Sequence, residues 1–179
     1  MKLNSAKLRK TKAGELTKSR TNKNELYIIL DNVLDTYNVG AVFRLADAVA
    51  AKKIFLCGYT ETPPNTRITK ASINTVDLTE WEHYEKAEDA IKDLRLAIKD
   101  IKIISIELDK KSVDYTKADY SFPIALIIGN ETHGISKEVM DASDTIVELP
   151  MLGVNVSINT MVSLAIVLYK TLELNHLNT

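Results

Sequence analysis

Three short segments of the chain combine asparagine and glycine in a pattern that suits the binding of a polar ligand. In the first, Asn38 and Gly40 lead into a helical sequence that carries Arg44 about one turn further on. Glycine lets the backbone approach another group closely, and Asn38 can cap the helix or bond a ligand. Taken alone, the segment also fits an ordinary helix cap followed by a surface arginine in a salt bridge, and this simpler interpretation is favoured.

The second segment is IIGNETHGIS, between a predicted strand and a predicted helix. Gly129 and Gly134 allow unusual backbone conformations, while Asn130 and Glu131 supply a hydrogen-bond donor and an acceptor. The spacing differs from the GxGxxG of dinucleotide sites, and the lysine of a phosphate loop is missing. The segment therefore suits a small polar molecule that lies against exposed backbone groups.

The third segment, residues 149–170, is LPMLGVNVSINTMVSLAIVLYK. Its small polar residues stand directly before an almost wholly apolar run. We expect a helix that begins after Asn155 or Val156, with Ser157 and Asn159 in its first turn, where free backbone amides face a ligand. The alternative is a capping serine with a satisfied asparagine. Three such segments at three predicted strand ends together favour a ligand site.

The elements that must position these segments alternate between strand and helix patterns. Short runs rich in β-branched residues predict buried strands at residues 25–33, 53–58, 101–108, 123–129 and 145–149. Helices are predicted at residues 41–51, 87–100, 135–142 and about 160–169, whereas residues 60–75 are expected to form a loop or a broken helix. This alternation predicts an α/β fold with a mostly parallel sheet and helices on both faces. Ligands of such folds lie beyond the carboxyl ends of the strands.

The composition indicates one ordinary globular domain, residues 25–175, in a chain of 179 residues that is 45% hydrophobic and 26% charged. No apolar segment near the N-terminus resembles a secretory signal, and the apolar run near the C-terminus is too short to span a membrane. A cytoplasmic protein is therefore expected. Cys57 has no disulfide partner, and no Cys/His cluster indicates a metal site, so Cys57 is expected to be a core residue.

Residues 1–24 form a basic N-terminal arm, whose only acid is Glu15. Its basic residues are Lys2, Lys7, Arg9, Lys10, Lys12, Lys18, Arg20 and Lys23. A poorly ordered or weakly helical arm of this kind could hold a phosphate backbone. A solvated tail that aids solubility explains the same residues equally well.

In order and spacing, the three segments resemble the three motifs of the SpoU (TrmH) family of RNA ribose 2′-O-methyltransferases, in the SPOUT superfamily. The matching residues are Asn38, Gly40 and Arg44, then Gly129, Asn130, Glu131 and Gly134, and then Leu149, Pro150, Met151, Gly153, Ser157, Ile158 and Asn159. The resemblance covers residues 26–170 approximately. Two positions depart from the usual family pattern, since Thr132 stands where glycine is frequent and Met161 stands where a second serine is frequent.

The resemblance implies a fold and a ligand that composition does not show. In the family, the C-terminal loops thread into a deep trefoil knot, a rare exception to unknotted topology, and S-adenosylmethionine binds in that knot. Two subunits pack their knotted regions together, so a homodimer is implied, with RNA as the other partner and no membrane. The implied cofactor-binding residues are Gly129, Asn130, Glu131, Gly134, Leu149, Met151, Ser157 and Asn159, and no metal is implied.

The implied reaction transfers the methyl group of the cofactor to a ribose 2′-hydroxyl. The sulfonium already makes this methyl group electrophilic, so the protein mainly supplies geometry and removes the hydroxyl proton. Arg44 would activate the hydroxyl together with an RNA phosphate, because a guanidinium is normally charged and cannot act alone as a base. Asn38, Ser157 and Asn159 would orient Arg44 and the ribose.

Structured RNA is the implied substrate. Transfer RNA is favoured, because the chain lacks the extra N-terminal globular domain of some ribosomal RNA members, and ribosomal RNA is the alternative. A methyltransferase of the same superfold that acts on a base is disfavoured by Asn38, Arg44 and Asn159. A non-catalytic RNA-binding factor of the same fold is disfavoured because Arg44, Asn159 and the cofactor loop are all retained.

Overall fold

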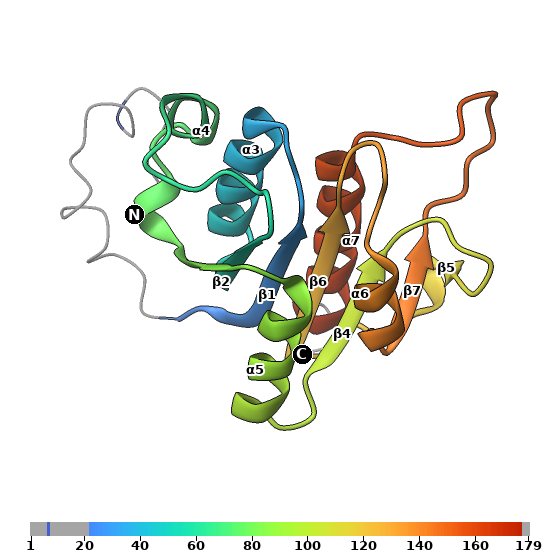
Figure 1. The fold of residues 1–179 in the computed structure, drawn as a ribbon. Helices are drawn as coiled ribbons and strands as arrows, with labels where there is room; N and C mark the ends of the chain where they lie inside the picture. Colours follow the sequence, from blue (N-terminus) through green and yellow to red (C-terminus); the bar gives the residue numbers. More distant parts are fainter. Residues whose placement is uncertain (1–6, 8–21, 177–179) are drawn as a thin grey trace.

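A single sheet of seven strands forms the centre of the protein in this computed structural model, which describes Lys7 and residues 22–176 (Figure 1). The strands are β1 (Asn24–Asp31), β2 (Ala51–Cys57), β3 (Glu80–Tyr84), β4 (Lys102–Ile106), β5 (Val113–Asp114), β6 (Ile124–Gly129) and β7 (Thr145–Glu148). Their order across the sheet is β3-β2-β1-β6-β4-β7-β5, and every neighbouring pair is parallel. The carboxyl ends of all the strands therefore meet at one edge of the sheet.

Helices cover both faces of this sheet. They are α3 (Thr36–Ala48), α4 (Thr66–Ser72), α5 (Ala87–Ala97), α6 (Lys137–Ala142) and α7 (Thr160–His176), with short 3-10 turns η2 (Val76–Leu78) and η3 (Tyr115–Lys117). Apolar side chains of α3, α4 and α7 join Leu26, Ile28 and Leu30 of β1 in one buried cluster. Those of α5 and α6 join Tyr27 and Ile29 in a second cluster, because successive strand residues point to opposite faces. The predicted α/β fold, with a parallel sheet between two helical layers, is confirmed.

Strands β3 and β5 were not predicted from the sequence. The β3 segment, EWEHY, is rich in charged and polar residues because it lies at the edge of the sheet, beside β2 alone. Its pairing partner supplies the apolar residues of this edge, with Ile54 opposite Trp81. Strand β5 has only two residues and lies at the other edge. Edge strands with little apolar surface have weak sequence signals, because they pack few side chains.

Helix α4 gives structure to the segment expected to be a loop or a broken helix. Its side chains pack on α3 at Gly40, where an added Cβ would lie 2.6 Å from Cβ of Ala71 and 2.7 Å from the carbonyl oxygen of Ile68. Gly40 was expected to allow a close backbone approach, and it does so for a neighbouring helix. The glycine of the first segment therefore sets the distance between α3 and α4.

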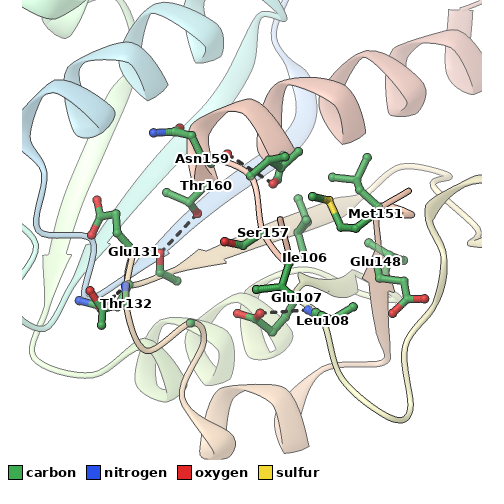
Figure 2. A pocket seen from close by; sticks show the side chains of 18 residues that line it. Ile106, Glu107, Leu108, Glu131, Thr132, Glu148, Met151, Ser157, Asn159 and Thr160 are labelled. Atoms are coloured by element: carbon green, nitrogen blue, oxygen red, sulfur yellow. Dashed lines mark hydrogen bonds between the residues drawn. The ribbon is translucent and has the colours of Figure 1, made fainter. Parts of the chain in front are cut away.

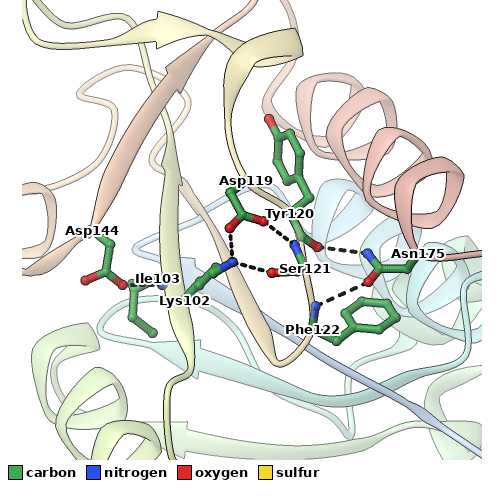
Figure 3. Close-up of polar contacts among 8 residues, drawn as sticks. All are labelled: Lys102, Ile103, Asp119, Tyr120, Ser121, Phe122, Asp144 and Asn175. Carbon is green, nitrogen blue, oxygen red and sulfur yellow. Dashed lines mark hydrogen bonds and ion pairs between the residues drawn. The ribbon is translucent and has the colours of Figure 1, made fainter. Parts of the chain in front are cut away.

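Helix α7 is longer than predicted, and Asn175 near its C-terminal end contacts the loop that precedes β6 (Figure 3). The side chain of Asn175 donates to the carbonyl of Tyr120 over 2.8 Å and accepts from the amide of Phe122 over 3.3 Å. The same loop carries Asp119, whose carboxylate forms an ion pair with Lys102. The pKa of Asp119 is lowered to about 2, mainly by the hydrogen bond that Lys102 donates. These contacts fix the C-terminal half of α7 against the segment that enters β6.

Cys57 is fully buried at the end of β2, as expected for a core residue. Burial raises the pKa of its thiol to about 12, with a smaller contribution from the negative charges of Asp31 and Glu88. No helix of the described residues is long and apolar enough to cross a membrane. The basic arm, residues 1–24, lies outside the described residues except for Lys7 and its last three positions.

Candidate active site

The second and third segments, with the end of β4, enclose a pocket of ≈ 480 Å³ at the carboxyl edge of the sheet (Figure 2). Its lining residues are Ile106, Glu107 and Leu108; Gly129, Asn130, Glu131, Thr132 and Gly134; Val147, Glu148, Leu149 and Met151; and Val156, Ser157, Ile158, Asn159, Thr160 and Ser163. They follow β4, β6 and β7 and extend into the start of α7. All the residues expected to bind the cofactor therefore lie around a single pocket.

The segment after β6 is a tight loop that its own backbone closes. The amide of Asn130 donates to the carbonyl of Gly134 over 3.0 Å, and the amide of Gly134 donates back over 2.9 Å. Gly134 has a φ of 70°, and a Cβ at this position would lie 2.3 Å from Oε2 of Glu107. A Cβ on Gly129 would lie 2.3 Å from the carbonyl carbon of Gly134. Neither glycine can carry a side chain without displacement of the pocket wall.

The side chain of Asn130 shapes this loop from within. Its Oδ1 accepts from the amides of Thr132 and His133, each over 2.9 Å, and its Nδ2 donates to the carbonyl of Asn32 over 2.9 Å. Asn130 therefore joins the loop after β6 to the loop after β1. Thr132 is not among the described residues with a positive φ, so the loop needs no glycine at this position.

Glu131 joins the second segment to the first. Its carboxylate accepts from the amides of Leu34 and Asp35, each over 3.0 Å, and from Nδ2 of Asn38 over 2.9 Å. Burial acts to raise the pKa of Glu131, but these hydrogen bonds outweigh burial, and the pKa lies below its usual value. Glu131 is therefore ionised at neutral pH and holds the start of α3 against the loop after β6.

Asn159 joins the third segment to the first. Its Nδ2 donates to Oδ1 of Asn38 over 3.1 Å, and Asn38 is only 6% exposed. The Oδ1 of Asn159 accepts from the amides of Met161 and Val162, over 2.9 and 3.3 Å. Asn159 is thus the cap of α7, which begins at Thr160 and not directly after Asn155 or Val156. The expectation that Asn159 lies inside the first turn is wrong.

Asn38, in contrast to Asn159, does not cap its own helix. Asp35 is the cap of α3, and its carboxylate accepts from the amide of Tyr37 over 2.8 Å. Asn38 lies within the first turn of α3, where its side-chain amide bonds Glu131 and Asn159. The two asparagines and the glutamate therefore form one hydrogen-bonded chain across all three segments, and sequence spacing did not predict it.

Arg44 lies on α3 but not around the pocket. Its side chain is exposed and forms no hydrogen bond or ion pair with any residue that the structure describes. Asn38 and Arg44 are six positions apart, which places them on different faces of a helix with 3.6 residues per turn. The expected contacts through which Asn38, Ser157 and Asn159 orient Arg44 are therefore absent from this chain. Ser157 itself lies in the loop before α7 and lines the pocket.

The end of β4 contributes pocket residues that sequence reasoning missed. Glu107 accepts from the amide of Ile135 through Oε2 and from that of Leu108 through Oε1, each over 2.9 Å. Ile106 and Leu108 are apolar, and no asparagine or glycine marks this strand end. The available signal was position alone, because residues that follow a parallel strand lie at the ligand edge.

The loop between β7 and α7 extends away from the sheet (Figure 1). Leu152 is 96% exposed and Val156 72%, which leaves apolar side chains without contact in one copy of the chain. A Cβ added to Gly153 would meet no atom within 4 Å. In contrast to Gly129 and Gly134, Gly153 thus has no packing role within one copy of the chain. Within residues 22–176, no group of three or more His, Cys, Asp or Glu side chains could hold a metal ion.

The sequence is similar to those of known proteins. The family model of the SpoU rRNA Methylase family matches residues 25–169. The tRNA (guanosine(18)-2′-O)-methyltransferase of Aquifex aeolicus is 31% identical over 150 residues, which are 82% of this chain and 68% of the relative. The 23S rRNA (guanosine-2′-O-)-methyltransferase of Ralstonia nicotianae is 26% identical over 148 residues, 83% of this chain and 58% of that protein.

A solved structure has the same fold. The AdoMet-bound rRNA methyltransferase of Sinorhizobium meliloti superposes with a TM-score of 0.78 at 29% sequence identity, over 93% of this chain and 59% of that one. This chain thus spans less than two thirds of several relatives. The family match extends from β1 into α7 and includes all three segments. The chain therefore belongs to the SpoU rRNA methylase family.

Proposed function

We propose that this chain is a methyltransferase that uses S-adenosylmethionine to methylate a ribose 2′-hydroxyl in tRNA or rRNA. The observation that carries the proposal is the pocket that the second and third family segments enclose, two of whose lining residues, Glu131 and Asn159, are hydrogen-bonded to Asn38 of the first segment. Relatives named as tRNA and 23S rRNA 2′-O-methyltransferases support it, as does the AdoMet-bound neighbour. Transfer RNA is the substrate we favour, and ribosomal RNA is the alternative.

The pocket has the chemistry that this cofactor needs. No arginine or lysine lines it among the described residues, whereas Glu107, Glu131 and Glu148 do. Phosphate-bearing cofactors are usually held by cations or by cradles of backbone amides, so the pocket suits a ligand that carries a positive centre and no phosphate. S-adenosylmethionine is such a ligand, because its sulfonium is positive. Leu149 and Met151 would supply apolar wall for its purine.

The residues of this chain would position the acceptor and hold the RNA phosphate that takes its proton. When bound, the cofactor supplies an electrophilic methyl group on its sulfonium. Asn159 would lie beside the ribose, since it lines the pocket, and Asn38 would hold the Asn159 side chain through their hydrogen bond. Arg44 is free of ion pairs within the described chain and can therefore bind an RNA phosphate. That phosphate, held by the guanidinium, would receive the proton of the 2′-hydroxyl as the oxygen attacks the methyl carbon.

A homodimer and a C-terminal trefoil knot are part of the same proposal. The side chains of Val156, Ile158, Val162, Ile166 and Tyr169 are between 37% and 72% exposed. An apolar surface of this kind on one loop and one helix suits a second copy of the chain. The fold likeness to solved family members supports the knot. The basic arm, residues 1–24, would add phosphate contacts to the RNA complex.

A methyl-transfer assay followed by nucleoside analysis tests the function. Purified protein receives S-adenosylmethionine with a labelled methyl group and either bulk tRNA or bulk rRNA, and the RNA is then digested and analysed by mass spectrometry. We expect the label on a 2′-O-methylated nucleoside from tRNA. Label on rRNA alone would select the alternative substrate, and label on a base would contradict ribose methylation. RNA binding without label would identify a non-catalytic factor.

A further inference from the structure

Tyr59 is the most exposed of the large aromatic side chains in the described part of the chain, at 84%. It follows β2 directly and therefore lies at the carboxyl edge of the sheet, the same edge as the pocket. It does not line that pocket. Tyr59 therefore exposes an aromatic ring at the edge that carries the candidate active site. This exposure requires a physical explanation, because a buried aromatic ring would stabilise the fold.

The backbone around Tyr59 is held firmly. The amide of Tyr59 donates to Oδ1 of Asn32 over 3.0 Å, and the amide of Gly58 donates to the carbonyl of Tyr84 over 2.9 Å. Asn32 and Gly58 both adopt positive φ values, 55° and 62°, and a Cβ on Gly58 would lie 2.2 Å from Oδ1 of Asn32. Thr60 is 3% exposed and accepts from the amide of Val33 over 3.0 Å. The ring is thus presented to solvent by a rigid turn.

Asn32 also connects this turn to the candidate active site. Its carbonyl accepts from Nδ2 of Asn130, the residue that shapes the loop after β6. Asp31, the last residue of β1, pairs with Cys57 on one side and with Gly129 on the other. Tyr59 and the loop after β6 are therefore separated by two strand spacings, about 10 Å. A nucleotide that neighbours the one at the pocket can span this separation.

Two unpaired cations lie on the helix that follows the Tyr59 turn in the chain. Arg67 and Lys70 are exposed on α4, the helix that follows the Tyr59 turn, and neither forms an ion pair within the described residues. Helix α4 packs on α3 through Gly40, and α3 carries the exposed Arg44. Exposed aromatic rings beside unpaired cations are typical of surfaces that bind single-stranded nucleic acid, since rings stack on bases and cations hold phosphates.

We propose that Tyr59 stacks on an unpaired base of the RNA strand next to the methylated ribose, while Arg67 and Lys70 hold phosphates of the same strand. This inference rests on the proposed function, because it takes RNA to be the substrate. Stacking explains the exposure of the ring, and the connection through Asn32 explains its rigid attachment. The surface formed by Tyr59, Arg67 and Lys70 would select RNA in which the base next to the target is unpaired.

Filter binding to bulk tRNA tests the proposal with full-length protein. Tyr59→Ala should weaken binding by about 5- to 150-fold, the range that corresponds to the loss of one base–aromatic stack. Tyr59→Phe and Tyr59→Trp should stay within about 3-fold of wild type, because both side chains retain an aromatic face. Arg67→Ala and Lys70→Ala should each lower the log–log salt slope of binding by close to one unit, whereas Tyr59→Ala should leave the slope unchanged.

Matched controls lie at the amino edge of the sheet, where the strands begin. Leu96, 85% exposed near the end of α5, and the exposed Lys99 provide Leu96→Ala and Lys99→Ala, which should bind tRNA as wild type does. Calorimetric affinity for S-adenosylmethionine should be unchanged in every variant. Fluorescence gives a second readout, because the new indole in Tyr59→Trp should be quenched by tRNA beyond the change that wild type shows through Trp81.

The outcomes separate this inference from the function on which it rests. If wild type neither binds nor methylates RNA, the proposed function fails and the stacking surface fails with it. If wild type methylates RNA and Tyr59→Ala behaves as Leu96→Ala does, only the stacking surface is overturned. If Tyr59→Phe loses as much affinity as Tyr59→Ala, a hydroxyl contact acts there and stacking is wrong.

Discussion

The side chain of Asn159 donates a hydrogen bond of 3.1 Å to that of Asn38, which lies 121 residues earlier in the chain. Asn38 in turn donates to Glu131 over 2.9 Å. One buried amide therefore holds together the helix that follows β1, the loop that follows β6 and the start of α7. Substitutions at two of these three residues should therefore change stability by an amount that differs from the sum of the single effects, because hydrogen-bonded neighbours do not act additively.

Two substitutions of Asn159 separate its two roles. Asn159→Ala removes both the cap of α7 and the donor to Asn38, and should cost about 1 kcal/mol of stability, or roughly 2–4 °C in Tm. Asn159→Asp keeps an acceptor for the amides of Met161 and Val162 but cannot donate. It should retain most of the Tm and still lose methyl transfer by about tenfold or more. Full activity in Asn159→Asp would mean that the bond to Asn38 is dispensable.

Gly134→Ala should disturb the pocket, although Gly134 is only half-buried. Its φ of 70° disfavours a side chain, and the new Cβ would lie 2.3 Å from Oε2 of Glu107. We expect a loss of about 1–3 kcal/mol in unfolding free energy, measured in urea, and weaker calorimetric binding of S-adenosylmethionine. Gly153→Ala is the matched control and should leave stability unchanged, because no atom lies within 4 Å of its Cβ position. Equal stability of the two variants would disprove the packing role of Gly134.

Arg44 should act on the acceptor and not on the cofactor, because it does not line the pocket. Arg44→Ala should bind S-adenosylmethionine almost normally in calorimetry, while methyl transfer falls by roughly two or more orders of magnitude. Arg44→Lys should restore little, since an ammonium cannot reproduce the planar fork that holds a phosphate and a hydroxyl together. Near-normal turnover of Arg44→Ala at saturating RNA would show that Arg44 does not activate the ribose hydroxyl.

The stability contributed by Glu131 should depend on pH. Burial opposes ionisation of Glu131, but the hydrogen bonds from Asn38, Leu34 and Asp35 outweigh it, so the folded pKa lies below the unfolded value of about 4.3. The contribution is therefore present above that unfolded value and is lost as pH falls through the lowered folded pKa. Glu131→Gln lacks it, so its stability deficit should be constant above the unfolded pKa and should narrow as the pH falls below it. Urea denaturation above and below this pKa measures the deficit, and a deficit that does not vary with pH would contradict the assignment.

The exposed apolar residues of the third segment should hold two copies of the chain together. Sedimentation at micromolar concentration should give a dimer, and a charged substitution such as Val162→Glu should shift it toward monomer, because an unpaired charge at an apolar interface is costly. Leu96→Glu provides the control, since this exposed apolar residue lies on α5, outside the proposed interface. A monomeric wild type would rule out the dimer.

Local pattern was sufficient for much of this fold. The strands around Ile28 and Leu126 are continuous apolar runs, because both faces of a parallel strand are buried, and such runs are legible in sequence. The three segments were recognised by residue type and order, and family membership is confirmed on the same residues. Edge strand β3 was missed, because Glu80, Glu82 and His83 face solvent and obscure its pattern.

Tertiary structure decided which residues meet. The sequence by itself determined the α/β class, the three motif segments and their place at strand ends, because each depends on periodicity or on residues close together in the chain. Only the sheet order β1-β6-β4-β7 brings the end of β4, with Glu107, into the pocket. Only the packing of α3 turns Asn38 inward toward Glu131 and Asn159 while it leaves Arg44 in solvent. Contacts between residues about a hundred positions apart depend on the order of the strands and on the rotation of the helices. The local sequence pattern determines neither of these.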